Sequence, residues 1–167
     1  MKMAAHSLTT CLWFDTQAEQ AAQFYVSVFE DAKIGRVIRY GKEGREIHGK
    51  EAGSVMTAEF EIAGRTFVGL NGGPHFKFNE AVSFQVHCDT QQEIDYFWSK
   101  LSEGGEEGPC GWLKDKYGVS WQVVPTILPK MLSDADSQKS QRVTKAFLQM
   151  KKFDIDKLAK AFDGAAA

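Results

Sequence analysis

The side chains that could ligate a metal or act as nucleophiles are few in this sequence, and they are scattered. The three cysteines, Cys11, Cys88 and Cys110, form no CxxC pair, and the four histidines form no HxH or HxxxH pair. Cys11 and Cys88 stand inside apolar, strand-like runs, where a thiol is usually an inert packing group. An odd number of cysteines without a pairing motif is typical of reduced thiols, so we expect a cytoplasmic protein without a disulfide framework.

Aromatic and neutral polar residues on the strand-like segments indicate a different chemistry, the binding of a small molecule. In a strand every second residue lies on the same face, and aromatic walls with a few neutral donors suit a small planar or hydrophobic ligand. The alternative is that these residues simply fill a core between sheets. The ligand-binding residues that the sequence predicts are Cys11, Trp13, Phe67, Asn71, Ser83, Gln85, Trp112 and Gln122.

Composition narrows the classes of partner. The 167 residues carry 20 basic and 22 acidic side chains, and the Lys and Arg residues do not cluster in a stripe. We therefore expect no nucleic-acid partner. No apolar run approaches the roughly 18 residues of a membrane span, so we expect no membrane partner. The first residues also lack the apolar stretch of a signal peptide.

A short motif that occurs twice organises the chain. The sequence DTQAE at residues 15–19 recurs as DTQQE at residues 89–93, each time after an apolar strand-like run. In both copies a Thr stands three residues before a Glu, which is the spacing of a capping box at the N-terminus of a helix. The repeat predicts helices over about 17–29 and 91–103, as parts of a duplicated unit.

Strand-like segments surround each predicted helix in the same order, and residues 41–53 form the longest loop-like stretch. The order is strand, helix and about three strands, in each half of the chain. It predicts an α+β fold of two βαβββ modules, at residues 8–73 and 81–125, within a single domain of residues 1–167. A linker at 74–80 joins the modules, and a helical tail occupies 126–167. The predicted strands are 9–14, 33–40, 54–62, 65–71, 81–88, 108–114 and 119–124.

Three runs carry a resemblance to a known family: LWFD at 12–15, SFQV at 83–86 and DKYGVSWQVVP at 115–125. With the duplicated βαβββ order, they resemble the vicinal oxygen chelate superfamily of glyoxalase I, bleomycin-resistance proteins and extradiol dioxygenases. Within it they are most similar to the PhnB-like branch, labelled 3-demethylubiquinone methyltransferase-like. The resemblance implies that each module bends a sheet around half of a cavity, and that the protein is a homodimer.

Enzymes of this superfamily bind a divalent metal through four side chains, normally His and Glu, from the first and last strands of each module. Carried over residue by residue, these positions fall at Thr10 (or Thr9), Gly69, Ala81 (or Ser83) and Gln122. Only Gln122 could donate to a metal, and a neutral amide oxygen is a poor sole ligand. We therefore expect no metal and no cofactor, and glyoxalase or dioxygenase activity is disfavoured.

The face of the first strand that lines the cavity differs between two alignments. Aligning the two halves of the chain with each other places Cys11 and Trp13 toward the cavity, whereas direct alignment with the superfamily places the other residues of this strand there.

The methyltransferase label of the branch can also be compared with the sequence. A methyltransferase of the common fold binds S-adenosylmethionine at a Gly-rich turn between a strand and a helix. The turn at residues 69–74 follows a strand, but no helical pattern comes after it.

Three functions are compatible with these features. The leading hypothesis is a metal-independent PhnB-like protein that binds or sequesters a small molecule in the cavity between its modules. The alternative is an enzyme of the same fold acting on a small metabolite, as a glyoxalase-like lyase, a dioxygenase or the methyltransferase of the label. The third is a regulatory protein that uses its C-terminal helices as a docking face. No catalytic residue is assigned.

Overall fold

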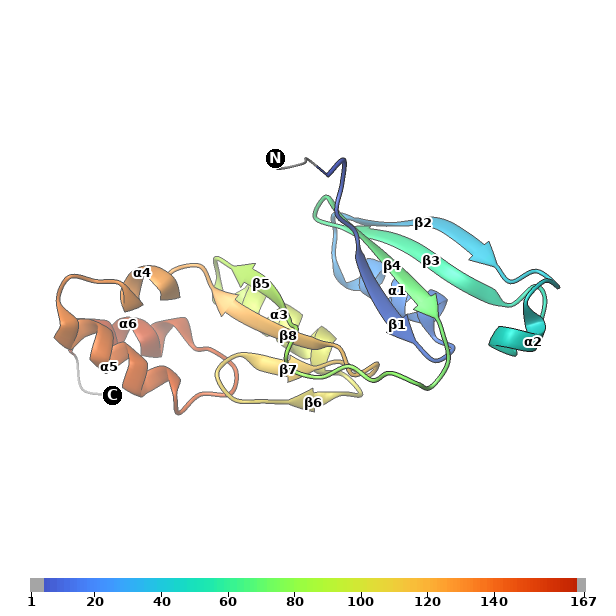
Figure 1. Ribbon diagram of the computed structural model, residues 1–167. Coiled ribbons are helices and arrows are strands. Elements are labelled where there is room, and N and C mark those ends of the chain that lie inside the picture. The colour runs from blue at the N-terminus through green and yellow to red at the C-terminus, as the bar shows by residue number, and fades with distance from the viewer. Residues whose placement is uncertain (1–4, 165–167) are drawn as a thin grey trace, which may run out of the picture. The chain divides into compact units, whose positions relative to one another are not determined.

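The computed structural model describes residues 5–164, and it divides into two compact units at the boundary between Lys77 and Phe78. Each unit contains a four-stranded sheet with a helix across one face (Figure 1). The order βαβββ occurs once in each unit, and helices follow the second, which confirms the predicted α+β fold class. The ends of the predicted chain-long domain, residues 1–4 and 165–167, lie outside the described residues.

In the first unit the strand order is β1-β4-β3-β2, with β1 parallel to β4 and the other pairs antiparallel. Helix α1 covers one face, and the short helix α2 lies inside the segment that the sequence marked only as a loop. β3 and β4 are joined by a tight hairpin in which Ala63 and Gly64 both have positive φ, as type I′ turns require. The elements are β1 (Thr10–Phe14), α1 (Ala18–Val28), β2 (Ala32–Arg39), α2 (Arg45–His48), β3 (Val55–Ile62) and β4 (Arg65–Asn71).

The second unit repeats this arrangement with the strand order β5-β8-β7-β6. The predicted strand 108–114 is shorter than expected, since residues 108–111 form a turn. The two-residue strand β6 was not predicted, because a Glu pair has low β propensity. The elements are β5 (Phe84–Cys88), α3 (Gln91–Ser102), β6 (Glu106–Glu107), β7 (Trp112–Lys114) and β8 (Ser120–Pro125).

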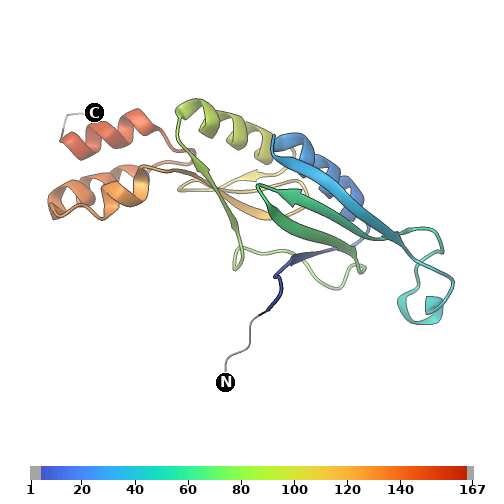
Figure 2. The same ribbon diagram turned by 90° about the horizontal axis from the view of Figure 1, so that it is seen from above.

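A helical tail completes the second unit, with α4 (Leu128–Leu132), α5 (Ser137–Phe147) and α6 (Ile155–Asp163). Figures 1 and 2 show α5 and α6 side by side. The sequence predicted a helical tail. The first of its helices, α4, has Pro129 in its first turn, where the missing amide proton costs nothing. Within residues 5–164, no helix is both long and apolar enough to cross a membrane.

The two copies of the repeated motif begin their helices differently. At α3 the capping box is complete: the Thr90 hydroxyl accepts from the Glu93 amide at 3.2 Å, and the Glu93 carboxylate accepts from the Thr90 amide at 2.9 Å. At α1 the N-cap is Gln17, without a side-chain cap, so the predicted box at Thr16 is wrong. Asn71 of β4 takes over, since its Oδ1 accepts from the Ala18 amide at 2.8 Å. A tertiary contact has replaced the local one.

This difference predicts unequal costs for two identical substitutions. Thr90→Ala removes a working cap and should lower the free energy of unfolding by about 1 kcal/mol. Thr16→Ala, at the corresponding position of the first copy, should change it by less than about 0.5 kcal/mol. Urea denaturation followed by circular dichroism measures both values. Equal losses for the two variants would contradict the assignment of the α1 cap to Asn71.

Candidate functional site

The two faces of the first sheet differ in what covers them. β1 and β4 run parallel, with Leu12 opposite Gly69 and Phe14 opposite Asn71. Leu12 and Phe14 are buried, and a Cβ on Gly69 would lie 3.0 Å from Ala18 of α1, so this face packs under the helix. Cys11 and Trp13 therefore point to the uncovered face, as the alignment of the two halves predicted.

Phe67 and Asn71 do not share that face, although the sequence grouped them with Cys11 and Trp13. Both are buried on the side of β4 that faces α1, because they lie two residues before and after Gly69 and every second residue of a strand shares a face. The Asn71 amide is engaged within the fold, capping α1 and donating to the Val55 carbonyl at 3.0 Å. These two predicted ligand-binding residues thus belong to the core, packed between the sheet and α1, whereas the sequence had offered a core between two sheets as the alternative.

Trp13 is held against the segment that follows β4. Its indole N–H donates to the Gly73 carbonyl at 2.8 Å, and its ring meets Phe76 edge-on at 4.9 Å. A Cβ on Gly72 would lie 2.1 Å from the Trp13 ring, so the glycine is required for this close approach. Trp13 thus packs on the segment that follows β4, whereas Cys11, on the same face of β1, is exposed.

The second sheet brings the other four predicted ligand-binding residues together. On its uncovered face the Gln122 amide donates to the Ser83 hydroxyl at 2.8 Å, and the Gln85 amide donates to the Gln122 carbonyl at 3.3 Å. We call this run of neutral side chains the polar chain. Trp112 is the cross-strand partner of Gln122, so its indole flanks the polar chain on the same face.

A hollow of about 350 Å³ lies beside Trp112, within the range of small-molecule pockets. Lys114 and Glu80 form an ion pair at its rim, and their hydrogen bond lowers the pKa of Glu80 and raises the pKa of Lys114. Opposite charges at the rim and an aromatic wall suit a planar, neutral or zwitterionic molecule. The lining includes Glu80, Glu107, Pro109, Trp112, Lys114 and Ser120.

The rim residues are the part of the site that the sequence did not predict. Glu80 lies in the predicted linker, and Glu107 in a strand too short to give a pattern. Trp98 of α3 donates to the Glu107 carboxylate at 2.8 Å, which fixes this acid beside the hollow. The one sequence signal near Glu107 is the Gly104-Gly105 pair, which is typical of a turn between α3 and the following segment.

The run that carries the most specific part of the resemblance has a structural role. Asp115 is 2% exposed and accepts from the Tyr117 amide at 2.8 Å, the Val119 amide at 3.1 Å and the Trp121 indole at 2.8 Å. Gly118 closes the turn with φ at 87°, a conformation that favours glycine. The carboxylate therefore organises the β7–β8 hairpin, which positions Trp112 and Gln122 on neighbouring strands.

The donors at the four superfamily metal positions do not fit a divalent metal. Gly69 lies under α1, so the uncovered face of β4 presents the aliphatic Val68 and Leu70 instead. At the corresponding positions of the second sheet, the donors are the neutral Ser83 hydroxyl and the neutral Gln122 amide. Across residues 5–164 no three His, Cys, Asp or Glu side chains group as a metal site would require.

The thiols do not favour nucleophilic chemistry. Partial desolvation of the otherwise exposed Cys11 thiol raises its pKa, and burial together with Glu93 and Asp89 raises the pKa of Cys88 to about 12. A thiol is a weak nucleophile until it is deprotonated, so both remain poor nucleophiles at neutral pH. The geometry thus supports binding through neutral polar groups and an aromatic ring.

Comparison with known proteins agrees with this architecture. Two βαβββ units with uncovered sheet faces define the class, which is the fold of the vicinal oxygen chelate superfamily. The chain belongs to the family described as 3-demethylubiquinone-9 3-methyltransferase, whose sequence model matches residues 6–124. The PhnB-like resemblance inferred from the sequence is therefore confirmed.

Solved structures give the same result. The PhnB protein of Bacillus cereus, whose description names the same methyltransferase, is 34% identical with a TM-score of 0.62, over 72% of this chain and 100% of that chain. Protein PA1353 of Pseudomonas aeruginosa is 16% identical with a TM-score of 0.58, over 72% and 98%. The fosfomycin resistance protein FosX of Mesorhizobium loti is 12% identical with a TM-score of 0.54, over 79% and 100%. These last two share the fold. No curated protein matches the chain.

Proposed function

We propose that this protein binds a small planar molecule, without a metal, at the uncovered face of its second sheet. The observation that carries the proposal is the polar chain beside Trp112. The Ser83 hydroxyl accepts from Gln122 and so keeps its own proton to donate, while the Gln85 carbonyl oxygen can still accept. A ring bearing a hydroxyl, carbonyl or amide could stack on Trp112 and pair with both groups.

Within this proposal the protein is a homodimer, as the resemblance implies, and it binds or sequesters its ligand in the cytoplasm, the compartment that the unpaired cysteines favour. The neutrality of the polar chain favours binding over nucleophilic catalysis, because none of its three side chains is a strong nucleophile. No nucleic-acid role is proposed, because 20 basic and 22 acidic residues give the chain no excess of positive charge.

Binding can be tested with 2-naphthol and benzamide as probes, by isothermal titration of the full chain. Gln122→Leu should weaken binding about tenfold or more, because it removes the amide that orients the Ser83 hydroxyl and the oxygen that holds the Gln85 amide, and each ligand group left without its partner costs roughly 1–3 kcal/mol. Gln23→Leu, at an exposed glutamine of α1, is the matched control and should bind like the wild type. Equal affinity for both variants would refute the site.

Metal independence has its own measurement. Protein purified without chelator and then dialysed should carry far less than one metal ion per chain by mass spectrometry. Stoichiometric zinc, nickel, iron or manganese would contradict this part of the proposal.

A second candidate is methyl transfer to a demethylated ubiquinone precursor, which the family description and the Bacillus cereus relative favour. The expected turn for S-adenosylmethionine does not fit, because β4 is followed by residues 72–83 without a helix and then by β5. Incubation with labelled S-adenosylmethionine and a demethylated ubiquinone analogue tests it. Label in the quinone that depends on Gln122 would favour this candidate over storage.

A further inference from the structure

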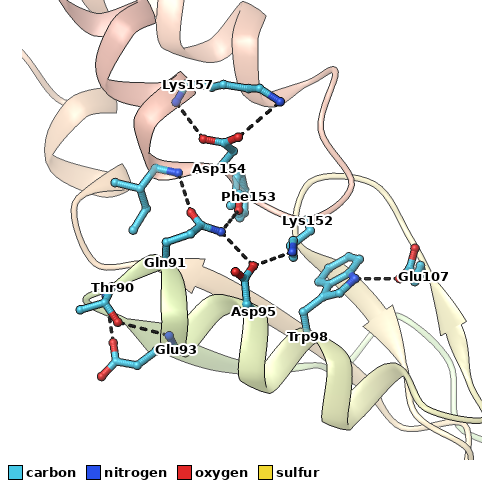
Figure 3. Close-up of polar contacts among 11 residues, drawn as sticks. Thr90, Gln91, Glu93, Asp95, Trp98, Glu107, Lys152, Phe153, Asp154 and Lys157 are labelled. Atoms are coloured by element: carbon cyan, nitrogen blue, oxygen red, sulfur yellow. Dashed lines mark hydrogen bonds and ion pairs between the residues drawn. The ribbon is translucent and has the colours of Figure 1, made fainter.

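Gln91, in the first turn of α3, makes two hydrogen bonds to the backbone of the helical tail. The Gln91 amide donates to the Phe153 carbonyl at 3.0 Å, and its oxygen accepts from the Ile155 amide at 2.9 Å (Figure 3). One helical turn further along, Asp95 pairs with Lys152 at 2.5 Å, and hydrogen bonds from Lys152 and Gln91 lower the pKa of Asp95. The segment between α5 and α6 is therefore held against α3 by side-chain contacts.

The same tail segment also holds the turn before β7. The Cys110 amide donates to the Met150 carbonyl and the Gly111 amide donates to the Lys151 carbonyl, both at 2.7 Å. Cys110 has φ at 54°, which is unusual for a residue other than glycine, and Gly111 has φ at 79°. A Cβ on Gly111 would lie 2.4 Å from the Phe153 ring, so the tail packs directly on the turn.

The residue that follows this turn is Trp112, which lines the hollow. The Trp112 amide donates to the Pro109 carbonyl at 3.0 Å, and the Trp112 carbonyl accepts from the Gly108 amide at 2.8 Å. Both partners of Trp112 line the hollow with it. The turn is also tied to β8, since the Val123 amide donates to the Gly111 carbonyl at 2.8 Å. A change in the left-handed pair, Cys110 and Gly111, would therefore move the Trp112 indole.

The tail lies outside the part of the chain that defines the family, because the family model ends at residue 124 and α4 begins at Leu128. We propose that the docked tail positions Trp112, so that tail docking controls the affinity of the hollow for a small molecule. The positioning rests on the contacts above, and the control of affinity rests on the proposed function. Gln91 is the positioning residue through which the tail is held.

The positioning is tested without a ligand, by fluorine NMR of protein labelled with 5-fluorotryptophan. Trp→Phe variants assign the four resonances. Gln91→Ala should shift or broaden the Trp112 resonance and leave the Trp13 resonance, in the first unit, unchanged. Gln92→Ala, at the exposed neighbouring glutamine, is the matched control and should change neither.

Alkylation of Cys110, measured by peptide mass spectrometry, reports whether the tail has opened. Gln91→Ala should raise its rate about tenfold, the factor expected when two hydrogen bonds are lost from the closed state. Faster alkylation with an unmoved Trp112 resonance would overturn the proposal, because the tail would then open without disturbing the hollow. An unchanged alkylation rate would also overturn it, because Gln91 would then not hold the tail.

Titration with 2-naphthol separates this proposal from the proposed function. Weaker binding by Gln91→Ala, by about threefold or more, supports both, since lost pre-organisation lowers affinity. If the wild type binds no 2-naphthol while the Trp112 resonance moves in Gln91→Ala, the positioning stands and the binding function fails for this probe. Binding that is equal in Gln91→Ala and the wild type overturns the control of affinity.

Discussion

Replacing Asp115 by alanine should lower the free energy of unfolding by about 3–5 kcal/mol, a large loss for a single polar side chain. The carboxylate is buried and accepts three hydrogen bonds, from the Tyr117 and Val119 amides and the Trp121 indole. Each donor left buried without a partner costs roughly 1–3 kcal/mol. Urea denaturation followed by circular dichroism gives the value.

Asp115→Asn separates the shape of the side chain from its acceptor oxygens. Its carbonyl oxygen can still receive the two backbone amides, but its amide group would meet the Trp121 indole donor. We therefore expect a loss of about 1–3 kcal/mol, between wild type and alanine. Asp31→Ala, at an exposed aspartate, is the control and should cost less than about 0.5 kcal/mol. An alanine variant as stable as this control would show that the turn does not depend on the carboxylate.

Replacing Phe153 by alanine should lower the free energy of unfolding by about 3–5 kcal/mol, the usual range for a buried phenylalanine. Its side chain is 2% exposed, packs on Gly111 and meets Phe147 edge-on at 6.3 Å. The cavity left behind cannot be filled by Gly111, which has no side chain. Denaturation monitored by circular dichroism measures the loss.

Leu148→Ala is the matched control, since Leu148 belongs to the same tail but is 57% exposed. It should cost less than about 0.5 kcal/mol. Deleting residues 133–167 should destabilise the second unit at least as much as Phe153→Ala, because it also removes the carbonyl partners of Cys110 and Gly111. A truncated protein of wild-type stability would favour the hypothesis that the tail is a docking face for a partner.

Several features could be predicted from the sequence because they depend on local patterns. The alternation of Ala58, Phe60 and Ile62 with Thr57 and Glu59 along the chain corresponds to a buried and a half-buried face of β3. The Ala63-Gly64 turn and the Thr90 capping box involve residues a few positions apart, so their geometry follows from local chemistry. The same is true of the turn after Asp115. Their order along the chain was enough to identify the fold.

The placement of the candidate site depended on contacts between distant segments. Asn71 looked like a ligand-binding residue, but β1 and β4 pair across more than fifty residues, and that register turned it toward Ala18. No local pattern specifies which face of a strand a distant helix will cover. For the same reason the sequence assigned a cap to Thr16 that Asn71 supplies instead.

The sequence by itself therefore determined the two βαβββ units, the family, and the three residues of the polar chain together with Trp112 beside it. These follow from strand alternation, turn chemistry and motif spacing, which act over short stretches of chain. Only the tertiary structure decided that Phe67 and Asn71 pack under α1, that Glu80 and Lys114 border a hollow, and that the tail holds the turn before Trp112. Those contacts join segments far apart in sequence, and packing selects them.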